Sequence, residues 1–147
     1  MKKVVITSAL RCAVGSLGKS LKNCPAYELG ASVISENIKK SKLKADQIDE
    51  VIMGQVLTGG SGQNPARQAA IKSNIPKEKP AYVVNQVCGS GIRSIASGYQ
   101  STRILFITRN VKFFSNISCC YPHMLSIKSI PKAVSYHCIY CFRVTPF

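Results

Sequence analysis

The first 100 residues alternate short β-branched runs with stretches of helical periodicity, and this alternation limits the fold more than any other feature. Extended runs occupy residues 4–7, 51–53 and 82–87, and each is followed by apolar residues at helical spacing. Strands that alternate with helices form mainly parallel sheets, with ligand sites outside the carboxyl ends of the strands. The sequence therefore predicts an α/β fold, a mainly parallel sheet covered by helices.

Two of the helices can be bounded from their residues. Pro25 fits the first position of a helix that ends near Ser41. Asn64 and Pro65 have the residue types of an N-cap and a first helical position. The apolar stripe predicted for the first helix consists of Ala26, Leu29, Gly30, Val33, Ile34 and Ile38.

Cys88 lies where the third extended run becomes a helix. The apolar residues that recur on one face of this helix are Ile92, Ile95, Ala96 and Tyr99. Gly89 and Gly91 permit a sharp turn and remove side chains that would obstruct a ligand. The N–H groups and positive dipole end at a helix start favour a thiolate and can hold a developing oxyanion. This setting suits a nucleophile, and the alternative is a buried structural thiol.

Two other features resemble ligand sites and are interpreted differently. The Gly59-Gly-Ser-Gly62 run lacks both the Lys-Ser/Thr ending of a P-loop and the spacing of a dinucleotide fingerprint, so it predicts a mobile loop that begins at Gly54. Arg67, near a helix start, is predicted to be a packing or salt-bridging residue. Neither feature indicates nucleotide binding.

The formal net charge of +14 could suit a nucleic-acid partner, but the cations are scattered along the chain. The only dense run, residues 39–44, is predicted to be a solvated helix end. No nucleic-acid partner is therefore expected. The seven cysteines, the absence of a convincing secretory signal and the absence of an apolar run of about 18 residues predict a cytoplasmic protein without a membrane partner.

Three collinear segments carry a family resemblance. They are Val4-Val-Ile-Thr-Ser-Ala-Leu-Arg11, Gly62-Gln-Asn-Pro-Ala-Arg-Gln-Ala-Ala70 and Asn85-Gln-Val-Cys-Gly-Ser-Gly91. With them, residues 1–100 resemble the amino-terminal part of a thiolase, in particular the acetyl-CoA C-acetyltransferase group. The resemblance implies that Cys88 is the nucleophile that takes an acyl group from coenzyme A as a thioester, with Gly89 and Gly91 supporting the turn or the oxyanion. It also implies an acyl-CoA substrate, no resident cofactor, and a homo-oligomer that pairs near the strand of the nucleophile.

The rest of that family's machinery is not among these 147 residues. A His in a Gly-His-Pro segment activates the nucleophile, and a second Cys in a Cys-x-Gly-Gly segment handles the α-proton of the second substrate. Neither segment is present, and His123 and His137 lie in neither context. We therefore expect weak acylation of Cys88 with little or no turnover, and the resemblance leaves open whether the chain is an enzyme.

Residues 101–147 depart from the rest of the chain, since they contain none of the ten glycines and none of the six acidic residues. We interpret residues 1–100 as a thiolase-like amino-terminal fragment and residues 101–147 as an unrelated tail, for which a reading-frame change is one hypothesis. The family's sheet would continue after Gln100 with another strand. The sheet is therefore expected to be partial, with an unpaired edge where that strand belongs.

The tail also offers a rival interpretation. Cys120-x-x-His123 and Cys138-x-x-Cys141 have the paired spacing of a four-ligand zinc site. A zinc-stabilised tail would make the chain a non-catalytic basic binding fragment. Because the tail has no glycine to form tight turns around a metal, we expect no metal site, and we keep this function as the alternative.

Overall fold

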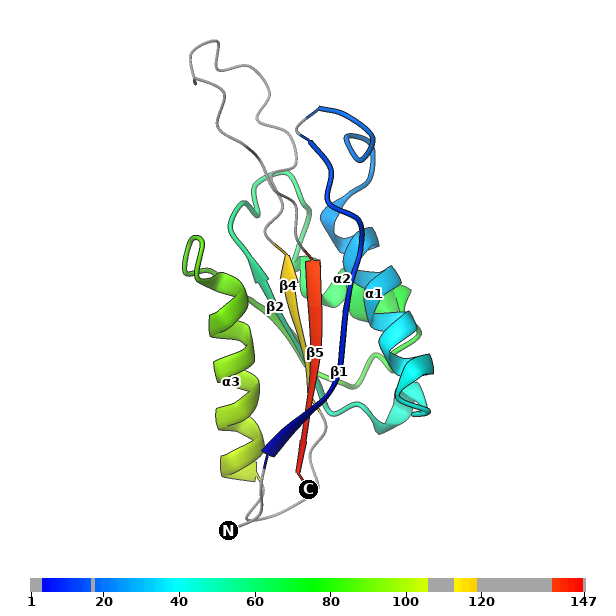
Figure 1. The fold of residues 1–147 in the computed structure, drawn as a ribbon, viewed down its shortest axis with the longest axis vertical. Helices are drawn as coiled ribbons and strands as arrows, with labels where there is room; N and C mark the ends of the chain where they lie inside the picture. Colours follow the sequence, from blue (N-terminus) through cyan, green and yellow to red (C-terminus); the bar gives the residue numbers. More distant parts are fainter. Residues whose placement is uncertain (1–3, 17, 106–112, 119–138, 147) are drawn as a thin grey trace.

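A computed structural model describes residues 4–16, 18–105, 113–118 and 139–146 (Figure 1). The elements in chain order are β1 (Val4–Arg11), α1 (Ala26–Lys40), the 3-10 helix η1 (Ala45–Gln47), β2 (Glu50–Gln55), α2 (Pro65–Lys72), β3 (Ala81–Val84), α3 (Ser90–Leu105), β4 (Phe113–Ser118) and β5 (Ile139–Pro146). Strand and helix alternate from β1 to β4, as the sequence predicts.

The five strands form one sheet in the order β1-β5-β4-β2-β3. β2 pairs in parallel with both β3 and β4, whereas β5 is antiparallel to its neighbours β1 and β4. Four strands therefore run in one direction and only β5 opposes them. The prediction of a mainly parallel sheet covered by helices is confirmed.

The helices cover both faces of the sheet, with α1 and α2 on one face and α3 on the other (Figure 1). This arrangement follows from the side-chain alternation along β2. Val51 and Met53 are buried in the larger core cluster, to which α1 and α2 contribute, whereas Ile52 packs with Tyr82 and Val84 on the other face. A strand buried on both faces is typical of a parallel sheet between helical layers.

The predicted boundaries of the first two helices are close to the observed ones. α1 has Pro25 as its N-cap and Ser41 as its C-cap, so it starts one residue later than predicted. Asn64 caps α2, and its side chain accepts the Arg67 N–H at 3.1 Å. The predicted stripe of α1 is buried except for Leu29, which is partly buried.

The apolar face predicted for α3 is not the face that the helix buries. Ile92 is 74% exposed and Tyr99 is 44% exposed. The buried positions of α3 carry small or hydroxyl side chains, namely Ser90, Gly91, Ser94, Gly98 and Thr102. Small residues allow a helix to approach a sheet closely, which explains why apolar periodicity indicated the wrong face.

Two strand predictions also need correction. The β-branched residues 4–7 favour a buried strand, but β1 is an edge strand, and Ile6 is 53% exposed. Val87 was assigned to the third strand, but β3 ends at Val84 and the Val87 side chain is 64% exposed. Apolar character alone does not distinguish an edge strand or a turn from a buried strand.

The open sheet edge expected after residue 100 is occupied. β4 lies beside β2 over its whole length, from Glu50 opposite Phe113 to Gln55 opposite Ser118. β5 then joins β4 to β1. Among the described strands, β3 pairs with β2 alone, so one of its edges is free.

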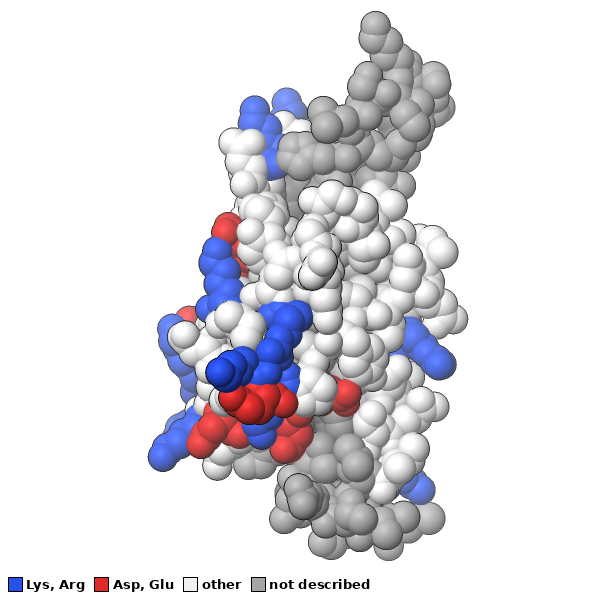
Figure 2. Space-filling model, turned by 180° about the vertical axis from the view of Figure 1, so that it is seen from behind, with Lys and Arg blue, Asp and Glu red and all other residues white. Residues whose placement is uncertain are grey.

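Charges on the molecule are unevenly distributed. Figure 2 shows Lys and Arg beside Asp and Glu over the side formed by α1 and α2, whereas the side where α3 lies is mostly uncharged. Two ion pairs belong to the charged side, Lys39 with Glu36 and Lys72 with Glu28. Within the described ranges, no helix has the length and apolar character needed to cross a membrane.

Candidate active site

Cys88 lies in the corner between β3 and α3, at the carboxyl end of the parallel strands, and it is exposed. The corner comprises residues 85–89 and the helix begins at Ser90, so the turn lies slightly earlier in the chain than the predicted turn of residues 88–91. Two backbone hydrogen bonds close it, from the Gly89 N–H to the Gln86 oxygen at 2.9 Å and from the Ser90 N–H to the Val87 oxygen at 3.1 Å. The structure thus places the predicted nucleophile on an accessible, tightly turned segment.

Val87 adopts a left-handed backbone conformation, with φ of 48°. This region is unfavourable for a β-branched residue, because its side chain crowds the backbone. Residues held in such conformations cluster at active sites, where the surrounding structure over-determines them. The residue immediately before Cys88 is therefore the most strained position of the corner.

Gly54 explains how α3 can start so close to the sheet. It lies within β2, not in the mobile loop predicted to begin there. A Cβ atom at this position would lie 2.5 Å from the carbonyl carbon and oxygen of Ser90 and 2.7 Å from the Gly91 nitrogen. Since no side chain can occupy that space, the first turn of α3 rests directly on the β2 backbone.

The two glycines after Cys88 take part in this close packing. The Gly89 N–H is used in closing the corner, and a Cβ on Gly89 would lie 3.2 Å from the Gln86 oxygen. Gly91 is buried in the first turn of α3 against Gly54. In the described part of the chain, the Cys88 N–H has no hydrogen-bond acceptor, which leaves it available to an oxyanion.

Arg67 is a structural residue of a neighbouring loop. Its guanidinium donates hydrogen bonds to the Lys79 oxygen at 2.7 Å and to the Lys77 oxygen. These bonds fix the segment that leads into β3. The arginine thus anchors backbone carbonyls, whereas the sequence predicted a packing or salt-bridging role.

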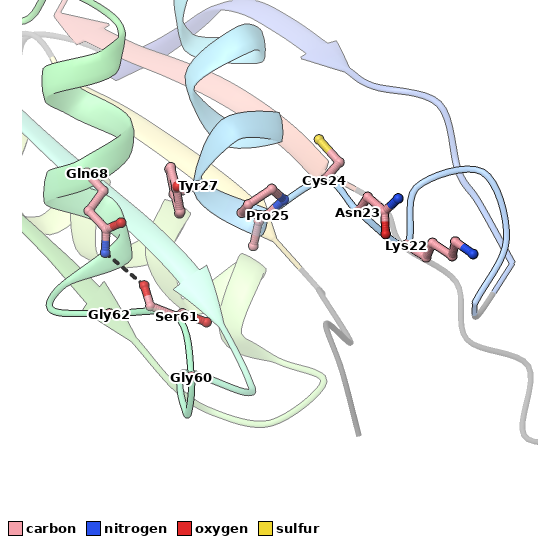
Figure 3. Close-up of a pocket in the computed structure, with 10 residues that line it drawn as sticks. Lys22, Asn23, Cys24, Pro25, Tyr27, Gly60, Ser61, Gly62 and Gln68 are labelled. Atoms are coloured by element: carbon pink, nitrogen blue, oxygen red, sulfur yellow. Dashed lines mark hydrogen bonds between the residues drawn. The ribbon is translucent and has the colours of Figure 1, made fainter. Parts of the chain in front are cut away.

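A separate pocket of about 360 Å³ lies between the start of α1 and the glycine-rich loop (Figure 3). Lys22, Cys24 and Tyr27 line it from the α1 side, and Gln68 donates a hydrogen bond to the Ser61 oxygen at 2.8 Å on the other side. Burial, and secondarily the Glu28 charge, raise the pKa of the Cys24 thiol, while Lys72 opposes them. Cys88 does not line this pocket, so the two cysteines belong to different environments.

The residues of the alternative zinc site are Cys120, His123, Cys138 and Cys141. The first three lie outside the described residues, and Cys141 lies in β5. The zinc alternative therefore stays a prediction.

Sequence reasoning missed the residues that shape the corner. In the sequence, Asn85 and Ser90 belong only to the family motif of residues 85–91, and Gly54 is predicted to begin a loop. Asn side chains commonly bond the backbone two residues later and so mark turns. An Asn directly after the apolar run of β3 could therefore have indicated a turn at Asn85. The contact between Gly54 and α3 joins segments far apart in the chain, and no local pattern reveals it.

Comparisons with known proteins agree with this geometry. A family profile described as "Thiolase, N-terminal domain" matches residues 4–105. An acetyl-CoA acetyltransferase of Pseudomonas aeruginosa is 55% identical over 103 residues, which cover 70% of this chain and 26% of that protein. An acetyl-CoA acetyltransferase of Cupriavidus necator is 57% identical over 95 residues, which cover 65% of this chain and 24% of that protein.

A solved structure has the same fold. A thiolase of Ascaris suum, crystallised in complex with coenzyme A, superimposes with a TM-score of 0.75 at 34% identity, covering 89% of this chain and 34% of that one. The chain spans about a quarter of the length of the curated relatives that it matches. The family match covers the strand, the corner and the helix that hold Cys88, and the chain therefore belongs to the thiolase family, matching its amino-terminal domain.

Proposed function

We propose that Cys88 accepts an acetyl group from acetyl-CoA. In this step the Cys88 thiolate attacks the thioester carbonyl carbon, the tetrahedral intermediate collapses, and the coenzyme A sulfur leaves with the bonding electrons. The thiol proton of Cys88 ends on coenzyme A. The products are an acetyl-thioester on Cys88 and free coenzyme A.

The observation that carries this proposal is the exposure of Cys88 on a corner where most of the other backbone N–H groups already donate hydrogen bonds. The Cys88 N–H lacks an acceptor among the described residues, so it can donate to the oxyanion of the intermediate. The names of the two bacterial relatives, and the coenzyme A bound to the Ascaris thiolase, support acetyl-CoA as the substrate. No resident cofactor is required for this step.

We further propose that a polypeptide of these 147 residues acylates without sustained turnover. The sequence contains neither the Gly-His-Pro segment nor the Cys-x-Gly-Gly segment of the family. Without a positioned base no group takes up the thiol proton of Cys88, and without a second thiol no group handles the α-proton of an acceptor. The proposed activity is therefore a single half-reaction.

Among the described strands, β3 has one edge without a partner, and this edge supports a homo-oligomer, because an unpaired strand edge offers backbone donors and acceptors to a second strand. Sedimentation velocity of the purified chain tests this part of the proposal. A species of twice the chain mass is expected, and a strictly monomeric protein across micromolar concentrations would argue against it.

Peptide mass spectrometry after incubation with acetyl-CoA tests the acylation. An acetyl adduct is expected on Cys88, and it should disappear in the Cys88→Ser variant. An adduct that forms on other cysteines but not on Cys88 would reject the nucleophile. Assays with acetoacetyl-CoA and coenzyme A should show no sustained turnover, and turnover abolished by Cys88→Ser would reject the half-reaction.

A further inference from the structure

Asn85 connects the end of β2 with the corner that carries Cys88. Its side-chain oxygen accepts the Val87 N–H at 2.9 Å, and its amide nitrogen donates to the Val56 oxygen at 2.8 Å. The first bond is the side-chain turn that Asn commonly makes to the residue two positions later. The second ties this turn to the segment that follows the neighbouring strand.

Ser90 holds the same turn from the helix side. Its hydroxyl donates to the Val87 oxygen at 2.6 Å and accepts the Gln86 N–H at 2.9 Å. The Ser90 residue is only 1% exposed, so water does not replace these bonds readily. Side chains therefore bind both the N–H and the carbonyl oxygen of Val87.

Val87 depends on such bonds because its own side chain contributes little. With φ of 48°, its backbone has an unfavourable conformation, and its side chain is 64% exposed. Packing of the isopropyl group cannot offset the strain. The hydrogen bonds from Asn85 and Ser90 remain as local interactions that favour the left-handed peptide over a relaxed one.

We infer that Asn85 and Ser90 are positioning residues that jointly hold Val87 in its left-handed conformation and thereby present the Cys88 thiol at the start of α3. Neither side chain needs to touch the sulfur or the substrate. The inference rests on the proposed function only in taking Cys88 as the reacting thiol. If the Val87 peptide relaxes, the Cys88 thiol is no longer aligned with the Cys88 N–H at the start of α3.

Alkylation of the folded full chain by iodoacetamide tests this role without acyl-CoA. The rate constant for Cys88 is followed at pH 7 by peptide mass spectrometry, with Cys24 as an internal reference. Asn85→Ala and Ser90→Ala should each slow Cys88 about fivefold, the size expected when one ordinary hydrogen bond no longer favours the corner. Ser90→Thr, which keeps the hydroxyl, should stay close to the parent chain.

Two matched controls separate positioning from general loss of stability. Asn64 also bridges two segments, since its side chain accepts the Arg67 N–H and donates to the Ala81 oxygen at 2.8 Å. Ser94 also donates its hydroxyl to a carbonyl three residues earlier, the Gly91 oxygen at 2.7 Å. Asn64→Ala and Ser94→Ala should lower the unfolding midpoint while leaving the Cys88 rate within twofold of the parent.

A Val87→Gly background gives the sharpest test. Glycine adopts positive φ without strain, so the corner should need Asn85 less, and Asn85→Ala should then slow Cys88 less than twofold. An undiminished fivefold effect in this background would overturn the inference, as would equal slowing by the two controls or unchanged alkylation in both Asn85→Ala and Ser90→Ala.

The outcome is independent of the acyl-transfer proposal. If the variants alter alkylation as expected but acetyl-CoA never labels Cys88, the positioning role stands and the proposed function fails. If acetyl-CoA labels Cys88 but Asn85→Ala and Ser90→Ala leave alkylation unchanged, the proposed function stands and the positioning role fails.

Discussion

Glu50 is a partly buried carboxyl at the start of β2, and its burial raises the pKa of that carboxyl above its ordinary value near 4.5. The folded protein therefore disfavours the charged form relative to the unfolded chain. The contribution of this group to stability is complete below the unfolded pKa and is lost as pH rises through the raised folded pKa.

Glu50→Gln should remove this pH dependence. We expect the free energy of unfolding of the variant, relative to the parent chain, to increase as pH rises from 4 to 7, because the variant has no charge to bury. Urea unfolding at several pH values measures it. A parallel pH profile for the parent chain and Glu50→Gln would contradict the interpretation.

The residue scale also shows what the sequence can predict about a site. The position of Cys88 between a strand and a helix could be derived from apolar patterns and two glycines. Asn85, Ser90 and the strain at Val87 could not, because they depend on hydrogen bonds and a backbone angle that no periodicity encodes. The local pattern indicated the candidate thiol but not the residues that shape its corner.

At the scale of elements, α3 packs closely on β2 because the residues between the two backbones have small side chains or none. Gly54 of β2 faces the first turn of α3, whose buried positions are glycine, serine and threonine. The buried hydroxyls of Ser94 and Thr102 donate hydrogen bonds to carbonyls of their own helix, the Gly91 and Gly98 oxygens, at 2.7 Å each. The helix therefore packs closely through small residues and leaves Ile92, Tyr99 and Ile104 exposed.

Gly54→Ala should disrupt this contact. Because the new Cβ would meet backbone atoms at 2.5 Å, the start of α3 must move, and overpacking of this kind costs about 1–3 kcal/mol. Urea unfolding should show the loss, and iodoacetamide should report a changed Cys88 rate.

Gly59→Ala is the matched control for that substitution. No atom lies within 4 Å of the position that its Cβ would occupy, so both stability and Cys88 reactivity should be retained. If Gly54→Ala proves as harmless as Gly59→Ala, the close packing of α3 on β2 is not needed.

At the scale of the whole molecule, the described strands form a continuous sheet through β4 and β5, which join β1 to β2 and β3. β1 pairs with β5, β5 with β4, and β4 with β2, so β1 has no direct pairing with the strands of the Cys88 side. Alternation in the first 100 residues predicted the parallel part of this sheet. The roles of β4 and β5 were missed, since their pairing is determined by distant partners and their unusual composition argued against a regular place in the fold.

Interrupting β4 should therefore affect the whole sheet. Proline at position 117 removes a backbone donor from a strand with partners on both sides, so Ile117→Pro should destabilise the protein by about 1–3 kcal/mol, the cost of leaving an acceptor of the ladder unpaired. Circular dichroism during urea unfolding measures it. A chain that ends at residue 112 should lose at least as much, and an unchanged midpoint in both variants would mean that the sheet is stable without β4.

The pairing of β1 with β5 sets the order in which this fold can form. Val4 lies opposite Pro146, so β1 cannot complete its pairing until β5 has been synthesised. Closing such a long loop carries a large entropic cost before any contact rewards it, and non-local pairing of this kind slows folding. During synthesis the segments α1 to α3 can assemble around the Cys88 corner while β1 is still unpaired, so this corner can form before the sheet is complete.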